Sequence, residues 1–170
     1  MRPDLRLRPL NDDDEAEALA AHAELAADDF SFLLDHDTAR PWAEHVQLHR
    51  RIRDGVDLPA DRVRGAFLLA TTDDDVVGRV PVRFELNDWL ATQGGHIGYG
   101  VRPGRRGQGY ATEILRQALV VARSEGVGAA LLTCDPDNEA SAAVILHNGG
   151  VEDEPHTDAA GTTKRRFWIA

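Results

Sequence analysis

Apolar residues follow two different spacings along the chain, and the two spacings alternate in blocks. Alternating positions and short apolar runs predict strands at six segments: Leu5–Leu10, Arg64–Thr71, Val76–Leu86, His96–Val101, Ala129–Cys134 and Arg165–Ile169. Apolar residues three and four positions apart predict four helices: one that follows Asn11 and Asp12, with its apolar stripe from Ala16 to Ala23, and three over about 41–54, 109–125 and 139–147. The order of these elements predicts an α/β protein in which helices pack on a mixed sheet.

Polar residues and glycines mark the ends of these elements. Asn11 can cap the first helix, and Gly55 and Gly126 follow the second and third helices as stop signals. The polar turn Thr72–Asp75 predicts that the strands on either side of it pair antiparallel. The unit from His96 to Cys134 predicts a right-handed crossover between parallel strands. We expect loops over 87–95 and in the polar segment before Arg165.

Composition narrows the class of protein. The 170 residues contain neither repeats nor a low-complexity linker, which predicts a single domain over residues 1–170. No segment approaches the roughly 20 uncharged apolar residues of a membrane helix, and the start MRPDLRLRPL has no apolar core of a secretory signal. We therefore expect no membrane partner and a cytoplasmic location. Cys134 is the only cysteine, which excludes an intrachain disulfide and a cysteine-based zinc site.

The charge balance opposes nucleic acid as a partner. The net charge is −10, from 19 basic and 29 acidic side chains, whereas phosphate backbones require clustered cations. One local exception stands out. Arg102, Arg105 and Arg106 form a positive cluster beside a glycine-rich turn.

The segment Gly98–Ala111 (GYGVRPGRRGQGYA) is the most informative in the chain. A predicted strand stops there, the chain turns through glycines, and a helix begins at once. The N–H groups and the positive end of such a helix favour a phosphate, and glycines allow a pyrophosphate to approach the backbone closely. Two common phosphate motifs are excluded. A P-loop is excluded because no Lys-Ser/Thr follows Gly107. The dinucleotide-binding pattern G-x-G-x-x-G is excluded because Gly98-x-Gly100 lies inside the strand and is followed by Pro103.

This loop resembles a known family. The run from Arg106 to Ala111 matches the Arg/Gln-x-x-Gly-x-Gly/Ala pattern of the GNAT superfamily of N-acyltransferases, and Asn138-x-x-Ser141 resembles the family's second CoA-contacting segment. The resemblance covers about residues 76–150. It implies a mixed, centrally splayed sheet of six to seven strands with helices on both faces. It also implies transfer of the acetyl group of acetyl-CoA to a primary amine, with a non-catalytic acyl-CoA-binding module as the alternative.

The resemblance also implies where acetyl-CoA would lie. Its pantetheine arm would run beside the fourth strand, and its pyrophosphate would rest on the glycine-rich loop. The implied contact residues are Tyr99, Gly100, Val101, Arg106, Gly107, Gln108, Gly109, Tyr110, Ala111, Asn138 and Ser141. The thioester carbonyl would face a backbone N–H near Gly100 or Val101. Many members of the superfamily dimerise through their C-terminal strands, so a homodimer is a possible partner state.

Candidates for proton transfer lie on and near the same strand. His96 stands near the position of the base in many GNAT enzymes, and Glu85 is a second candidate base. Each has a structural alternative: His96 as a cap of the strand edge and Glu85 as a solvated carboxylate. The tyrosine that the family uses as general acid is replaced by Ile145, seven residues after Asn138, which leaves Tyr99 or water as the proton donor.

The remaining candidates favour structural roles. His45 and His49 are spaced for a metal, but HVQLH lacks the glutamate of HExxH, so we expect a packed or solvated helix face and no metal. Cys134 lies in an apolar strand and is expected to be a small buried residue. Trp89, in the loop near the expected acceptor end, is a candidate for the wall of that site.

Overall fold

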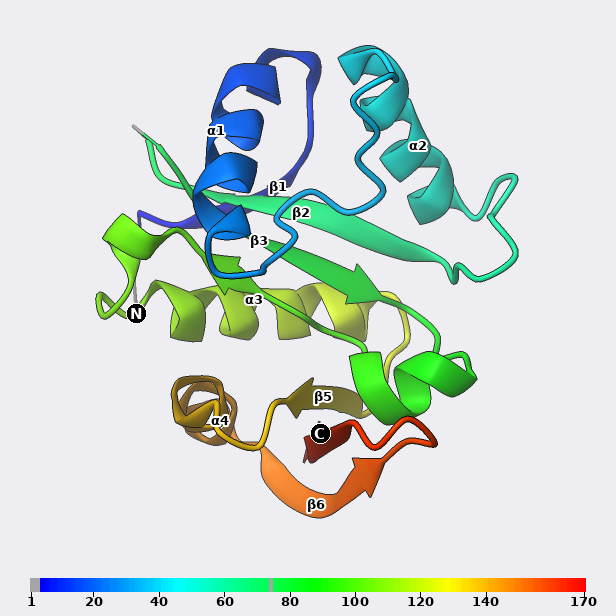
Figure 1. Cartoon of the computed structure of the whole chain (residues 1–170), viewed down its shortest axis with the longest axis vertical. Helices are drawn as coiled ribbons and strands as arrows, with labels where there is room; N and C mark the ends of the chain where they lie inside the picture. Colours follow the sequence, from blue (N-terminus) through cyan, green and yellow to red (C-terminus); the bar gives the residue numbers. More distant parts are fainter. Residues whose placement is uncertain (1–3, 74) are drawn as a thin grey trace.

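The computed structural model describes residues 4–73 and 75–170 and builds two antiparallel sheets packed with helices (Figure 1). The helices are α1 (Glu15–Ala26), α2 (Trp42–Asp54), α3 (Tyr110–Ser124) and α4 (Glu139–His147), with short turns η1 (Asp12–Asp14), η2 (Leu90–Gly94) and η3 (Pro103–Arg105). The strands are β1 (Arg6–Pro9), β2 (Gly65–Thr71), β3 (Val76–Arg83), β4 (Gly100–Val101), β5 (Ala130–Cys134), β6 (Val151–Thr157) and β7 (Thr163–Ile169).

The helices begin and end at the residues whose chemistry predicts it. Asn11 and Asp14 form a capping box at η1, which leads directly into α1. Pro41 precedes α2, and Gly55 ends it in the left-handed conformation at φ 72°. The predicted loop 87–95 differs from expectation, because η2 forms a π-helical turn within it.

The first sheet has the order β1-β2-β3-β4 and the second has the order β5-β7-β6. The antiparallel pairing of β2 with β3 confirms the prediction from the Thr72–Asp75 turn. The sequence missed β6, which was expected to be part of a polar loop. Its seven residues are almost all exposed, and Pro155 lies where the register with β7 shifts. An edge strand of this kind has no buried face and therefore no apolar alternation.

The fourth and fifth strands splay apart, as the resemblance implied. In the described residues β4 and β5 belong to separate sheets, and their segments meet only at His96. The backbone N–H of His96 donates to the Leu131 carbonyl at 2.7 Å, while the Leu131 N–H donates to Nδ1 of the His96 ring at 2.9 Å. Because a side chain takes the place of the next backbone acceptor, the ladder cannot continue, and the strands separate.

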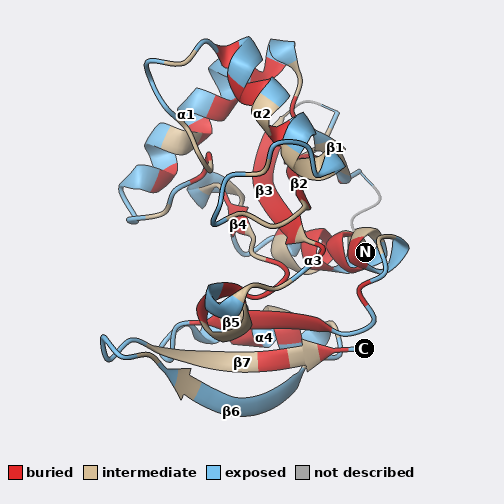
Figure 2. Ribbon diagram, turned by 90° about the vertical axis from the view of Figure 1, so that its right-hand side faces the viewer, coloured by how far each residue is buried: buried red, intermediate tan, exposed pale blue. Residues whose placement is uncertain are grey.

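Two apolar clusters hold the layers together. One joins β2 and β3 to α1 and α2, around Phe32, Leu69 and Val46. The other joins both sheets to α3 and α4, around residues such as Ile114 and Phe167. Figure 2 shows the buried strands between these helical layers, while β6 is exposed at the outside. The described residues therefore form the predicted α/β architecture with helices packed on both faces, but their seven strands divide into two antiparallel sheets of four and three strands.

Among the described residues, no helix combines the length and apolar character that a membrane span requires.

Candidate active site

β4 and β5 lie in separate sheets whose segments are hydrogen-bonded to each other at His96, and we call the splay between the two strands the gap. Along β4 the partner strand β3 has a proline, Pro81, at the position opposite Gly98. The Gly98 N–H reaches the Pro81 carbonyl at 3.3 Å, but proline has no N–H to return the bond. This accounts for the short β4: regular pairing resumes only at Gly100–Val101, not over the predicted 96–101.

The backbone groups of alternate β4 residues face the gap. Gly98 and Arg102 donate to β3, so the alternation of an antiparallel ladder directs the N–H of Gly100 to β3 as well. The amides of Tyr99 and Val101 then face away from β3. The Val101 carbonyl accordingly accepts from Nε of Arg106 at 3.2 Å, on the gap side. Of the two predicted oxyanion donors, this register favours Val101 over Gly100.

The N-terminus of α3 opens onto the same gap. Gly107 and Gly109 adopt φ values of 71° and 82°, a region that favours glycine, and Gly109 caps α3 without any side-chain hydrogen bond. A methyl group placed on either glycine would meet nothing within 4 Å. The loop thus forms an open cradle in front of a helix N-terminus, which fits a pyrophosphate.

The three arginines beside this cradle are each paired with acidic groups. Arg102 bonds Glu17, Glu24 and Asp75, and these bonds raise its pKa. Arg105 also bonds Asp75. Arg106 is half exposed and bonds Asp28 at 2.7 Å. Arg102 and Arg105 therefore anchor the loop to α1 and to the β2–β3 turn. The backbone N–H groups of the loop remain as the main hydrogen-bond donors for a phosphate.

The second predicted segment meets the gap at the start of α4. Oδ1 of Asn138 accepts from the Ser141 N–H at 3.0 Å and caps the helix. Oγ of Ser141 lies 2.9 Å from the hydroxyl of Tyr99, which also donates to the Ser141 carbonyl at 3.2 Å. Burial raises the pKa of Tyr99 to about 12. The Tyr99 hydroxyl is thus a protonated donor that spans from the β4 segment to α4.

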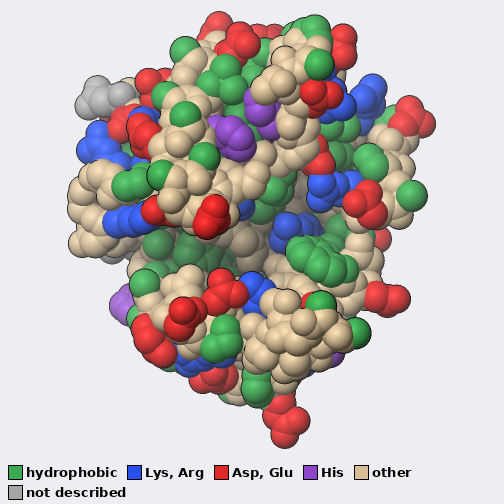
Figure 3. All heavy atoms as spheres, in the orientation of Figure 1, with side chains coloured by type: hydrophobic (Ala, Val, Ile, Leu, Met, Phe, Trp, Pro, Cys, Tyr) green, Lys and Arg blue, Asp and Glu red, His purple; other side chains and the backbone are tan. Residues whose placement is uncertain are grey.

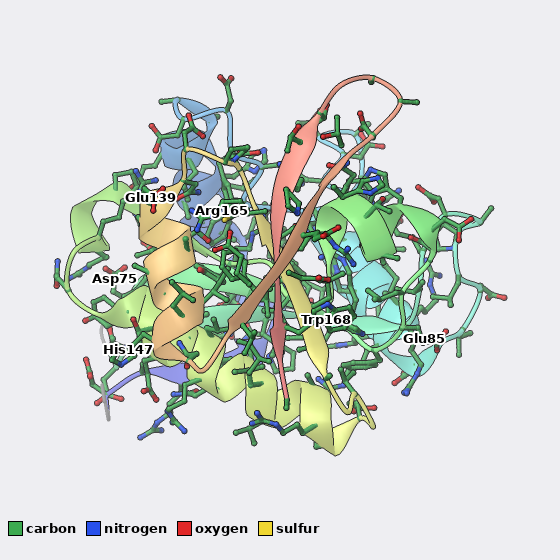
Figure 4. The ribbon with its side chains drawn as sticks, turned by 90° about the horizontal axis from the view of Figure 1, so that it is seen from below. Asp75, Glu85, Glu139, His147, Arg165 and Trp168 are labelled. Atoms are coloured by element: carbon green, nitrogen blue, oxygen red, sulfur yellow. The ribbon has the colours of Figure 1, made fainter. Side chains whose placement is uncertain are left out.

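Arg165 on β7 holds this end of α4 in place. Its guanidinium bonds Glu139, the first residue of α4, at 3.2 Å and Glu152 of β6 at 2.7 Å. Figure 4 shows Glu139 and Arg165 close together, with His147 at the other end of the helix. Ile145, in the position of the family's tyrosine, is fully buried in the core.

His96 and Glu85 are placed differently from what a base requires. Nδ1 of His96 accepts from Leu131, so the neutral ring carries its proton on Nε2 and can take a second proton only by losing that bond. Burial and the nearby Arg83 also lower the pKa of His96. Glu85 is exposed and lies at the periphery, far from α4 (Figure 4). The geometry therefore favours the structural alternative for both residues.

Residues 4–151 match the family model described as an acetyltransferase (GNAT) domain. The chain belongs to the GNAT acetyltransferase family. RimJ from Mycobacterium smegmatis, solved with a CoA disulfide, is 22% identical, with a TM-score of 0.68 over 97% of this chain and 81% of that one. YncA from Salmonella typhimurium, a putative acetyltransferase solved with acetyl-CoA, is 14% identical, with a TM-score of 0.64 over 98% and 93%.

A probable acetyltransferase has a TM-score of 0.75 at 16% identity, over 99% of this chain and 93% of that one. At these identities the similarity shows the fold, which confirms the GNAT-like architecture that the resemblance implied. No curated protein sequence matches this chain significantly.

A pocket of about 410 Å³ opens on the α1 and α2 face of the GNAT sheet, beside the closed end of the gap. Its wall includes His49 and Ile52 of α2, Phe67 of β2, Pro81 and Arg83 of β3, and the mostly exposed Trp89. Figure 3 shows a hollow across the middle of the corresponding face, with Lys and Arg side chains in its walls. Trp89 was singled out from the sequence. Arg83 was not, because a cation in an apolar strand has no motif.

The histidines of α2 are packed inside the fold. His45 and His49 are buried, with ring centroids 4.7 Å apart. Cys134 is buried as well, and burial raises the pKa of its thiol.

Proposed function

We propose that this GNAT protein transfers the acetyl group of acetyl-CoA to a primary amine of a small molecule or peptide, by direct attack of the nitrogen on the thioester carbonyl. The observation that carries the proposal is the common opening of two features onto one gap. These are the edge of β4 that faces away from β3 at Tyr99 and Val101, and the N-terminus of α3, where the N-cap Gly109 makes no side-chain capping bond and the glycine cradle is open.

The chain's own groups match the parts of the donor. The N–H groups at the start of α3 and in the loop from Gly107 would bind the pyrophosphate. The edge of β4 would pair with the pantetheine amides as another strand does. The Val101 N–H, directed into the gap, would then donate to the thioester carbonyl as negative charge develops on its oxygen.

The transfer step balances without a covalent enzyme intermediate. The amine nitrogen forms a bond to the acetyl carbon, the carbon–sulfur bond breaks, the nitrogen loses one proton and the sulfur gains one. We assign Tyr99 as the group that donates a proton to the leaving thiolate, since its protonated hydroxyl lies at the start of α4. Water in the pocket would accept the proton of the amine, since neither His96 nor Glu85 is placed to do so.

A non-catalytic acyl-CoA-binding module is the second candidate, favoured by one observation. The family's acid position on α4 holds Ile145, which is buried. Such a module would bind acetyl-CoA with no turnover, so the two functions separate on activity alone.

The test is isothermal titration of the purified protein with acetyl-CoA, CoA and, as a comparator, NADH, followed by thiol-release assays with amines. Micromolar binding of both CoA species without NADH binding, together with amine-dependent thiol release, supports the transferase. Binding without release for any amine supports the module. Failure to bind either CoA species overturns both.

A further inference from the structure

Two arginines of β3, the buried Arg79 and the half-buried Arg83, lie on the face of the sheet that α1 and α2 cover. Arg79 and Arg83 are four residues apart on one strand, with Pro81 between them, so all three side chains point to the same side of the sheet. Arg79 is 6% exposed. Its Nη2 donates to the Ser31 carbonyl at 2.9 Å, and its guanidinium stacks 4.4 Å from the centre of the Phe30 ring.

Neither arginine has an acidic partner among the described residues. Nε of Arg79 is buried without any hydrogen-bond acceptor, and Arg83 reaches only the carbonyl of Gly95, at 3.3 Å, and more weakly that of Gly94. The nearby Asp35 is already paired with Arg62. Burial and the charge of Arg83 lower the pKa of Arg79 to about 9. Burial and the charge of Arg62 lower the pKa of Arg83 to about 10.

Such an arrangement is costly in a folded protein. A buried cation without a counter-charge loses its hydration, and a second cation nearby adds repulsion. Perturbed ionisable groups of this kind concentrate at functional sites, where a ligand supplies the missing partner. The ligand that would offset this cost is an anion.

The two guanidinium groups converge on Gly98. A methyl group placed on Gly98 would lie 3.9 Å from Nη1 of Arg79 and 4.0 Å from Nη1 of Arg83. Gly98 is the point where Pro81 interrupts the pairing of β4, one residue before the gap-facing amide of Tyr99. The pocket of about 410 Å³ reaches the same place through its wall residues Pro81 and Arg83.

We propose that Arg79 and Arg83 form an anion subsite for the acceptor, and that the acceptor is a small amine with a carboxylate or phosphate group near its nitrogen. This inference rests on the proposed transferase function. The phosphates of the donor have their own cradle at α3, on the far side of β4, so the arginines remain for the acceptor. The volume of the pocket suits a small molecule.

The experiment measures thiol release with acetyl-CoA and matched amines that differ only in charge. One arm pairs α- and ω-amino acids with their amides, a second pairs phosphoethanolamine with ethanolamine, and a third uses spermidine. We expect kcat/KM to be at least ten times higher for the anionic member of the productive pair. The first two arms decide between carboxylate and phosphate. Equal or higher kcat/KM for the amides, for ethanolamine or for spermidine overturns the inference.

Variants test the residues themselves. Arg79→Gln and Arg83→Gln should each raise KM for the anionic amine at least tenfold and reduce its advantage over the neutral partner, while Arg79→Lys should retain part of it. Arg51→Gln removes the same charge from the exposed face of α2 and should change neither value. Unchanged charge selectivity in both glutamine variants would overturn the assignment.

Two further measurements keep the test independent of folding defects and of the proposed function. In the unmodified protein, sulfate should inhibit competitively with the amine and not with acetyl-CoA; inhibition competitive only with acetyl-CoA contradicts an acceptor subsite. Titration with acetyl-CoA reports the donor site alone. If the unmodified protein does not bind acetyl-CoA, the transferase function is refuted. If it binds acetyl-CoA and acetylates uncharged amines as well as it acetylates anionic ones, only the anion subsite is refuted.

Discussion

At the scale of single residues, His96 and Tyr99 each connect parts of the molecule that are far apart in the sequence. The ring of His96 replaces a backbone acceptor for Leu131, 35 positions away, and so closes the gap between the sheets. The hydroxyl of Tyr99 crosses from the β4 segment to Ser141 on α4, 42 positions away. Each role depends on one side-chain group, the imidazole of His96 or the hydroxyl of Tyr99, which makes each testable by a single substitution.

His96→Ala should lower the free energy of unfolding by about 1–3 kcal/mol, because the buried N–H of Leu131 loses its acceptor. Urea denaturation measures the change, and His96→Asn, which keeps an acceptor near Nδ1, should lose less. The acid limb of the pH–rate profile should be the same in His96→Ala and the unmodified protein. Unchanged stability with a lost acid limb would instead identify His96 as the base.

Tyr99→Phe should lower kcat roughly 100-fold, which is at the lower end of the contribution of a general acid, while acetyl-CoA binding changes little. The raised pKa of Tyr99 means that the hydroxyl stays protonated up to about pH 12, so no basic limb below pH 10 should come from it. Single-turnover thiol release measures the step directly. A Tyr99→Phe protein with full kcat would show that water protonates the sulfur.

At the scale of elements, the loop from η3 to α3 is held by ion pairs and kept open by glycines. Arg102 and Arg105 join it to Asp75, and Arg102 also reaches the acids of α1. The loop is therefore fixed before any ligand arrives, and its backbone presents N–H groups to the gap at little entropic cost. Two glycines at opposite ends of α3 allow a matched test of this role.

Gly109→Val should weaken CoA binding at least 100-fold with little loss of secondary structure. The new side chain would strain the φ of 82° and project into open space where the pyrophosphate is expected. Gly126→Val is the control, since Gly126 has a φ of 91° and equally open surroundings at the other end of α3. Titration calorimetry with CoA and circular dichroism check both. Equal effects of the two substitutions on binding would contradict the assignment of the loop.

At the scale of the whole molecule, four histidines form a continuous series between α1, α2 and the segment that joins them. The ring centroids are 5.4 Å apart from His22 to His36, 5.5 Å from His36 to His45 and 4.7 Å from His45 to His49. His45 is 1% exposed, and neither of its ring nitrogens has a partner among the described residues. Burial, and then His49 and His36, lower the pKa of His45 to about 4.

This series should make the fold sensitive to acid. The folded pKa of His45 lies below the unfolded value of 6.5, so the unfolded chain binds more protons. The stabilisation is complete above about pH 6.5 and is lost as the pH falls toward 4. We expect a loss of ~2 kcal/mol between pH 7 and pH 5. His45→Met should flatten this dependence, and His147→Met, at an exposed position, should not. Urea denaturation at several pH values measures both, and an equally steep dependence in His45→Met would refute the role of His45.

Assembly and location stay predictions at this scale. A homodimer through the C-terminal strands is consistent with the exposed edge strand β6 and the exposed Val151 at its start. Sedimentation of the purified protein would decide the oligomeric state. The cytoplasmic location rests on the sequence alone.

The elements whose physics is local could be predicted from the sequence. The 3.6-residue spacing of Ile114, Leu115 and Ala118 predicted α3, and Pro41 and Gly55 bounded α2. The glycines after Arg106 predicted the turn before α3 and indicated the family. These features depend on neighbours within a few positions, so a sequence is sufficient to predict them. The strand β6 was not predicted, because a strand without a buried face has no alternation of apolar and polar residues in its sequence.

The hydrogen bonds and ion pairs between residues far apart in the sequence became known only from the folded chain. In the sequence, His96 could be a base or a cap of the strand edge, and the bond from Leu131 to its ring favours the cap. Arg102 could bind a phosphate or anchor the loop, and its ion pairs with Glu24 and Asp75 favour the anchor. Arg79 and Arg83 are two cations in an apolar strand until folding places both guanidinium groups beside Gly98, with Arg79 buried and Arg83 half-buried. Charge and hydrogen bonding are properties of pairs, and these pairs form across dozens of residues, so their roles appear only in the folded chain.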